Sequence, residues 1–126
     1  MTDPLSLRQC TFTMALSMLI QRIVNAGYQC KIQELNRTIE TQREYVAKGV
    51  SKTLDSRHLD NLAADIYIFK HRELVNDLNE YRRFGEYWEG LGGRWGGRFG
   101  LEKETKEVQD SKLGWDVFHF EMKRLT

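Results

Sequence analysis

The segment that decides the fold lies near the end of the chain and reads DVFHFEM, residues 116–122. Aromatic and polar side chains alternate along it, which is the pattern of a β-strand. Because successive side chains of a strand point to opposite faces, His119 and Glu121 share one face. Phe118 and Phe120 then point to the other face. The sequence therefore predicts a strand over residues 116–122 whose apolar face packs inward, while the other face presents an imidazole beside a carboxylate.

A second buried strand is predicted over residues 62–69, which are rich in β-branched and aromatic side chains. Asp65 lies within this strand, and His58 lies in the loop before it. If the two strands pair, His58, Asp65 and His119 can converge on one point. Two imidazoles and one carboxylate suit a catalytic zinc ion that keeps its fourth position open for water.

Such chemistry also needs a carboxylate that takes the proton of the attacking water and passes it to the leaving amine. By position alone, Asp116 and Glu121 are both candidates. Simpler interpretations stay open, because an aspartate soon after a histidine is a weak pattern and a histidine between two phenylalanines is usually packed or hydrogen-bonded. The residues alone therefore allow a zinc hydrolase without requiring one.

The rest of the chain mixes helical and extended patterns. Apolar residues at helical spacing predict an amphipathic helix over residues 7–26, which Gly27 ends. The further elements predicted are a strand over 28–35, a helix over 38–47, a helix over 72–83, a glycine-rich loop over 85–100 that contains Trp88 and Trp95, and a loop or short helix over 102–112. Because strands and helices do not alternate regularly, an α+β fold is expected.

Length and charge narrow the class of protein. The 126 residues are about the length of one domain, so we expect a single domain over residues 1–126. A formal charge of +1 provides no net field that draws the chain to nucleic acid. The most apolar stretch, residues 13–24, is too short to cross a bilayer, and no secretory signal is recognised, so we expect a cytoplasmic product without membrane insertion. Cys10 and Cys30 are too few for a disulfide scaffold and are expected as free thiols.

Four segments, taken together and in order, carry the most specific signal in the sequence. They read RTIETQ at 37–42, GVS at 49–51, SRHLDNLAAD at 56–65 and DVFHFE at 116–121. This arrangement resembles the VanY-type D-alanyl-D-alanine carboxypeptidase family, whose pattern is an upstream arginine and glutamine, a Ser-x-His-x-x-Gly-x-Ala-x-Asp segment and a terminal acid-x-x-His. Asn61 stands where the family has glycine, and asparagine tolerates left-handed geometry best after glycine.

The resemblance implies an antiparallel central sheet with flanking helices and a Zn²⁺ ion held by His58, Asp65 and His119. It further implies Asp116 as the general base and acid, and Arg37 as the cation that holds the substrate carbonyl or the oxyanion. Residues implied to contact the substrate or to orient a ligand are Ser56, Gln42, Glu121 and Trp95. Among these, Trp95 and the two glycines after it would form a wall of the cleft that lets the substrate backbone approach.

The activity implied is hydrolysis of the peptide stem of bacterial peptidoglycan by a monomer. Aspartate rather than glutamate at position 116 is similar to the family's phage L-alanyl-D-glutamate peptidases, so we expect an endolysin that reaches the wall after holin-type release. One alternative is a D-alanyl-D-alanine carboxypeptidase or dipeptidase on the same site. Others are a non-catalytic zinc-stabilised interaction domain and a small phage structural protein. The presence of both Asp116 and Arg37 favours catalysis, because a structural zinc site needs neither.

Overall fold

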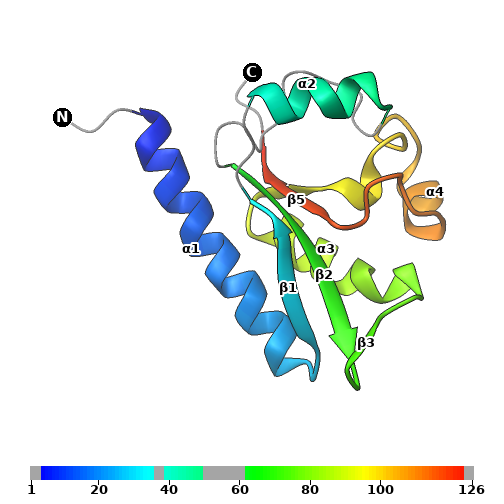
Figure 1. Ribbon diagram of the computed structural model, residues 1–126. Coiled ribbons are helices and arrows are strands. Elements are labelled where there is room, and N and C mark those ends of the chain that lie inside the picture. The colour runs from blue at the N-terminus through cyan, green and yellow to red at the C-terminus, as the bar shows by residue number, and fades with distance from the viewer. Residues whose placement is uncertain (1–3, 36–38, 50–61, 124–126) are drawn as a thin grey trace.

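Helices and short strands follow one another along the parts of the chain that the computed structural model describes, residues 4–35, 39–49 and 62–123 (Figure 1). In chain order the elements are α1 (Pro4–Asn25), β1 (Gln29–Glu34), α2 (Ile39–Ala47), β2 (Ala63–Lys70), β3 (Glu73–Leu74), the 3-10 helix η2 (Leu78–Tyr81), α3 (Arg82–Gly90), β4 (Gly93–Trp95), the 3-10 helix η3 (Gly96–Arg98), α4 (Lys106–Ser111) and β5 (His119–Met122). This confirms the predicted α+β class.

The described strands form one antiparallel sheet in the order β1-β2-β5-β4, with β3 paired to β2. The two strands that the sequence singled out are therefore direct neighbours. In their register Asp65 of β2 lies opposite His119 of β5. On the other side of β5, Arg94 of β4 lies opposite Glu121. Since directly opposed residues share a face of a sheet, these four polar side chains follow one another across a single face.

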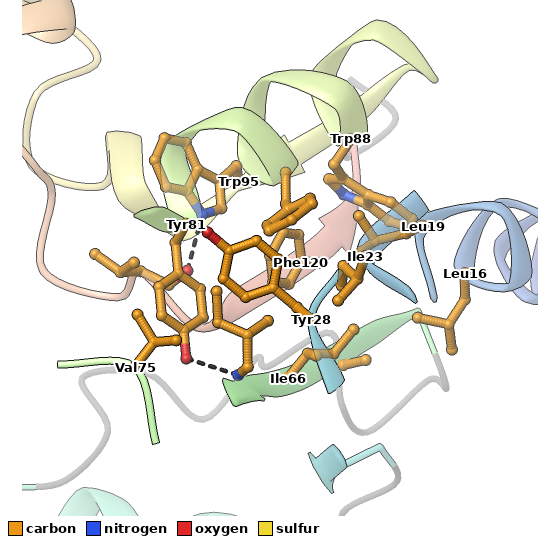
Figure 2. Close-up of a cluster of buried hydrophobic side chains, with 14 of the residues drawn as sticks. Leu16, Leu19, Ile23, Tyr28, Ile66, Val75, Tyr81, Trp88, Trp95 and Phe120 are labelled. Carbon is orange, nitrogen blue, oxygen red and sulfur yellow. Dashed lines mark hydrogen bonds between the residues drawn. The ribbon is translucent and has the colours of Figure 1, made fainter. Parts of the chain in front are cut away.

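One hydrophobic core joins α1, α3 and the sheet (Figure 2). α1 runs alongside β1 (Figure 1), and its buried stripe belongs to the same core as the buried residues of the sheet. That stripe has the helical spacing predicted from the sequence and consists of Phe12, Leu16, Leu19 and Ile23. It meets Ile66 of β2, Trp88 of α3 and Phe120 of β5, all almost completely buried. Burial of each large apolar side chain stabilises the fold by about 1.5–3 kcal/mol.

Three aromatic side chains also anchor the strands by hydrogen bonds inside this core. The indole N–H of Trp95 donates to the carbonyl of Val117 at 2.8 Å, and that of Trp88 donates to the carbonyl of Glu121 at 2.8 Å. The hydroxyl oxygen of Tyr81 accepts the N–H of Ile68 at 2.8 Å (Figure 2). The two tryptophans therefore hold the backbone on both sides of His119.

The prediction of a helix over residues 72–83 is wrong. His71 and Arg72 have positive φ angles of 53° and 67° and form a tight turn that returns the chain as β3. Asp77 then begins η2, because its carboxylate accepts the N–H of Asn79 at 3.0 Å. The α-helix itself starts only at Arg82, ten residues later than predicted. Hairpin and capping geometry thus prevailed over the helical spacing of apolar residues.

The glycine-rich loop predicted over residues 85–100 is also wrong, since α3, β4 and η3 occupy this stretch. Its glycines serve close packing of the tryptophans. A Cβ atom at Gly85 would lie 2.0 Å from the Trp95 ring, and one at Gly93 would lie 2.1 Å from the Trp88 ring. Glycine is therefore needed here so that helix and strand can contact the flat indole faces.

The other elements agree with the sequence more closely. The first helix, the strands β1 and β2, the helix α2 and the short helix α4 lie where they were predicted, within a few residues. Cys10 is exposed, Cys30 is partly buried, and both are free thiols. Within the described ranges no helix combines the length and the apolar character that crossing a membrane requires.

Candidate metal centre

Asp65, Asp116 and His119 meet at the centre of the polar face of the sheet. One ligand atom from each residue lies within 4.8 Å of the others. Nδ1 of His119 lies 3.2 Å from Oδ1 of Asp65 and 3.8 Å from Oδ2 of Asp116. The register of β2 and β5 creates the first of these contacts, because it places Asp65 and His119 opposite each other.

Asp116 reaches the site from a turn rather than from the strand. β5 begins at His119, three residues later than predicted, because the His119 N–H donates to the Asp116 carbonyl at 3.1 Å and closes a turn. The Asp116 N–H in turn donates to the carbonyl of Gly96 at 3.2 Å. A Cβ atom at Gly96 would lie 1.9 Å from the Asp116 carbonyl oxygen and 2.9 Å from Cβ of His119. Glycine at position 96 therefore lets this turn pack against η3.

The second ring nitrogen of His119 is held by Glu121. Nε2 lies 2.8 Å from Oε1 of Glu121, and the two residues are only 6% and 4% exposed. A carboxylate on the ring nitrogen that faces away from a metal fixes the orientation of the ring and raises its basicity as a ligand. The ring of Phe99 lies 5.5 Å from the imidazole, centroid to centroid, and packs against it.

Three carboxylates surround one imidazole, which makes the centre attractive to a cation. Burial lowers the pKa of His119, but the hydrogen bonds with Asp65 and Glu121 and the charges of Asp116 and Asp65 outweigh it. Together these groups raise the pKa to about 9. At neutral pH the ring therefore carries a proton on each nitrogen: Nδ1–H donates to Asp65, and Nε2–H donates to Glu121. A metal ion would replace the first of these protons.

The donor set fits a divalent metal such as zinc. Nitrogen and oxygen ligands at about 2.0–2.2 Å from a tetrahedral ion would stand about 3.3–3.6 Å apart. The separation of 3.2 Å between Nδ1 of His119 and Oδ1 of Asp65 is close to the lower end of this range. The carboxylate of Asp116 lies farther from Nδ1, at 3.8 Å, and is still close enough to share an ion with the other two residues. The described residues that could hold the ion are thus Asp65, Asp116 and His119.

The structure places the remaining predicted site residues as follows. Glu121 lies on the site, on the far side of the His119 ring. Trp95 does not form a wall of a cleft, because its side chain is fully buried and supports the backbone beside His119. The glycines after it accommodate the chain's own backbone and the Trp95 ring instead of a substrate. The side chain of Gln42 and all of Arg37, Ser56 and His58 lie outside the described residues.

Sequence reasoning missed two residues beside the centre. Arg94 faces Glu121 from the neighbouring strand. Its place beside the centre can be recognised only once the register of β4 and β5 is known. Trp115 precedes Asp116 directly and is 56% exposed, whereas the other two tryptophans are buried. Its ring lies 5.3 Å from the ring of Phe99. The sequence signal that could have found Trp115 is its place directly before Asp116 in the last motif.

Neither a protein-family model nor the sequence of a curated protein matches this chain. Solved structures that are similar to it include two peptidases. The Serratia marcescens L-Ala D-Glu endopeptidase ChiX superimposes with a TM-score of 0.65 at 21% sequence identity, over 89% of this chain and 77% of ChiX. A mutant of the vancomycin-resistance D,D-pentapeptidase VanY from a VanB-type cassette, in complex with Zn(II), superimposes with a TM-score of 0.57 at 20% identity, over 88% of this chain and 70% of VanY. The chain therefore has the fold of the VanY-like peptidases, as its sequence motifs imply.

Proposed function

We propose that this protein is a zinc metallopeptidase that hydrolyses the peptide stem of bacterial peptidoglycan. The observation that carries the proposal is the convergence of Asp65, Asp116 and His119, with Glu121 holding the far nitrogen of the His119 ring. The centre lies on a fold shared with two solved peptidases, one of which was solved with Zn(II).

The chain's own residues have separate tasks in the proposed reaction. A bound zinc ion supplies Lewis acidity that polarises the scissile carbonyl and acidifies water. Asp65 and His119 hold the ion, together with His58 as the family resemblance implies. The carboxylate of Asp116, 3.8 Å from Nδ1 of His119, accepts the proton of the attacking water and delivers it to the leaving amine nitrogen. Arg37 is assigned by the same resemblance to stabilise the oxyanion.

The proposed bond is the one between L-alanine and D-glutamate. Aspartate at position 116 supports this choice, because the resemblance associates it with the endolysin branch of the family. The likeness to an L-Ala D-Glu endopeptidase over most of both chains also supports it. We further propose that the protein serves in phage or prophage lysis and reaches the wall after release from the cytoplasm. The similarity to a D,D-pentapeptidase keeps D-alanine release as the second candidate.

The test is mass spectrometry of the fragments released from purified sacculi. Wild type, Asp116→Ala and a chelator-treated sample are compared side by side. The proposal expects chelator-sensitive fragments with a new D-glutamate amine, and none from Asp116→Ala. Release of free D-alanine instead would retain the centre and change the substrate to that of the second candidate. A zinc-loaded wild type that releases nothing would point to a non-catalytic domain and contradict the proposal.

A further inference from the structure

One oxygen of the buried Glu121 carboxylate has no hydrogen bond to any residue that the structure describes. Oε1 is held by the His119 ring, but Oε2 is the buried side-chain atom without a hydrogen-bond partner among the described residues. A buried charged oxygen left without compensation is expensive, and such groups are normally paired with an opposite charge. The surroundings of Oε2 must therefore supply that charge.

Arg94 is the cation that faces this oxygen. Its Nη1 lies 3.7 Å from Oε2, and the two residues are directly opposed in the register of β4 and β5. The same guanidinium donates from Nη2 to Oε1 of Glu102 at 2.8 Å. Glu102 is itself fixed, because its other oxygen accepts the N–H of Gly100 at 2.9 Å. The guanidinium also lies 4.4 Å from the centroid of the Phe99 ring and stacks on it.

We propose that Arg94 is a positioning residue that tunes the metal affinity of the centre through Glu121. Glu102 and Phe99 hold the guanidinium in place, and its charge orients the carboxylate of Glu121. Glu121 then keeps Nε2–H of His119 as a donor and Nδ1 directed to the metal. The inference rests on the metal-binding part of the proposed function and adds a residue that makes no contact with metal or substrate.

The geometry explains why arginine suits this position. Its planar fork reaches two carboxylates at once, one buried and one at the surface, whereas a lysine offers a single point charge. An isolated surface ion pair between Arg94 and Glu102 would contribute little and would leave the metal unaffected. A substitution at position 94 therefore separates the two possible roles of Arg94. Metal binding weakens if Arg94 positions Glu121, and it stays unchanged if Arg94 only forms a surface ion pair with Glu102.

The experiment measures Zn²⁺ affinity by competition with a chromophoric chelator. We expect Arg94→Met to weaken binding about tenfold, within the range seen when residues behind metal ligands are altered. Arg94→Lys should lose less, because it keeps the charge. The matched control is Lys106→Met, which removes a cation from an exposed ion pair with Asp110 and should leave the affinity unchanged.

A double-mutant cycle with Glu121→Gln separates action through Glu121 from any general effect. In the Glu121→Gln background, Arg94→Met should cause no further loss of affinity. A second readout is NMR of the zinc-loaded protein, in which the Nε2–H proton of His119 should exchange faster with water in Arg94→Met than in wild type. If Arg94→Met does not fold, Arg94→Lys takes its place in the cycle and in the exchange measurement.

Two results would overturn the inference. One is a zinc affinity of Arg94→Met within twofold of that of the wild type. The other is a loss of zinc affinity on Arg94→Met that is as large in the Glu121→Gln background as in the wild type. The failure of the proposed function gives a different result, because the wild type itself would then bind no zinc. Binding by the wild type with no effect at Arg94 overturns the positioning role alone.

Discussion

Replacement of Gly96 by alanine should disable the centre although none of its polar side chains is replaced. The added Cβ would lie 1.9 Å from the Asp116 carbonyl oxygen, whereas such contacts are essentially never shorter than 3.0 Å. The turn that carries Asp116 must therefore move by about 1.1 Å. The same added Cβ would lie 2.9 Å from Cβ of His119, so the residue that carries the imidazole is displaced as well. Misplacement of reacting groups by about 1 Å can lower turnover by about 100-fold.

The assay combines turnover on sacculi, zinc affinity and thermal unfolding. We expect Gly96→Ala to lose about 100-fold in turnover, with a loss of stability of about 1–3 kcal/mol from overpacking. Gly90→Ala is the matched control, because a Cβ at this helix end meets nothing within 4 Å. A Gly96→Ala protein with wild-type turnover and zinc affinity would refute the assignment of Gly96 to the packing of this turn.

Three further outcomes follow from single contacts. Tyr81→Phe leaves the buried N–H of Ile68 without its acceptor and should lower the free energy of unfolding in urea by about 1–3 kcal/mol. The control, Tyr67→Phe, removes the hydroxyl of a half-buried tyrosine on β2 and should lower it clearly less. Equal losses of stability in the two variants would contradict the role of Tyr81. In the metal-free protein, the pKa of His119 is about 9, above the value of about 6.5 expected in the unfolded chain. Between these two pH values the native state binds one more proton at His119 than the unfolded state does. The free energy of unfolding should therefore fall as the pH rises from 7 to 9.5. A flat profile, or the same fall in His119→Gln, would speak against this pKa. Trp115 is the exposed tryptophan and adjoins Asp116, so binding of Co²⁺ should quench fluorescence in wild type and much less in Trp115→Phe.

The sequence alone was sufficient for the part of the centre that depends on local periodicity. Alternation along residues 116–122 correctly placed His119 and Glu121 on one face, as their 2.8 Å contact shows. The apolar run at 62–69 correctly predicted the strand that carries Asp65. Pairing of these two strands was a conditional expectation, and their register confirms it. Both results rest on the period of two that a strand imposes on its side chains.

Features that depend on contacts between distant segments could not be predicted in this way. Arg94 and Glu121 meet only because β4 pairs with β5 in one particular register. Gly96 has its role because a turn twenty residues later packs against it. The family resemblance placed Trp95 in the wall of a substrate cleft, but the structure buries its side chain completely, which the neighbouring glycines do not indicate. Long-range packing, and not local propensity, decided each of these cases.

The most direct test of the account is the zinc content of four proteins purified without chelator. Wild type and Asp116→Ala should each retain about one zinc ion per chain, because Asp116 acts beside the ion. Asp65→Ala and His119→Ala should lose the zinc ion, since each removes one of the few protein ligands of a catalytic zinc site. Zinc retained in full by both ligand variants, or absent from the wild type, would contradict the proposed metal centre.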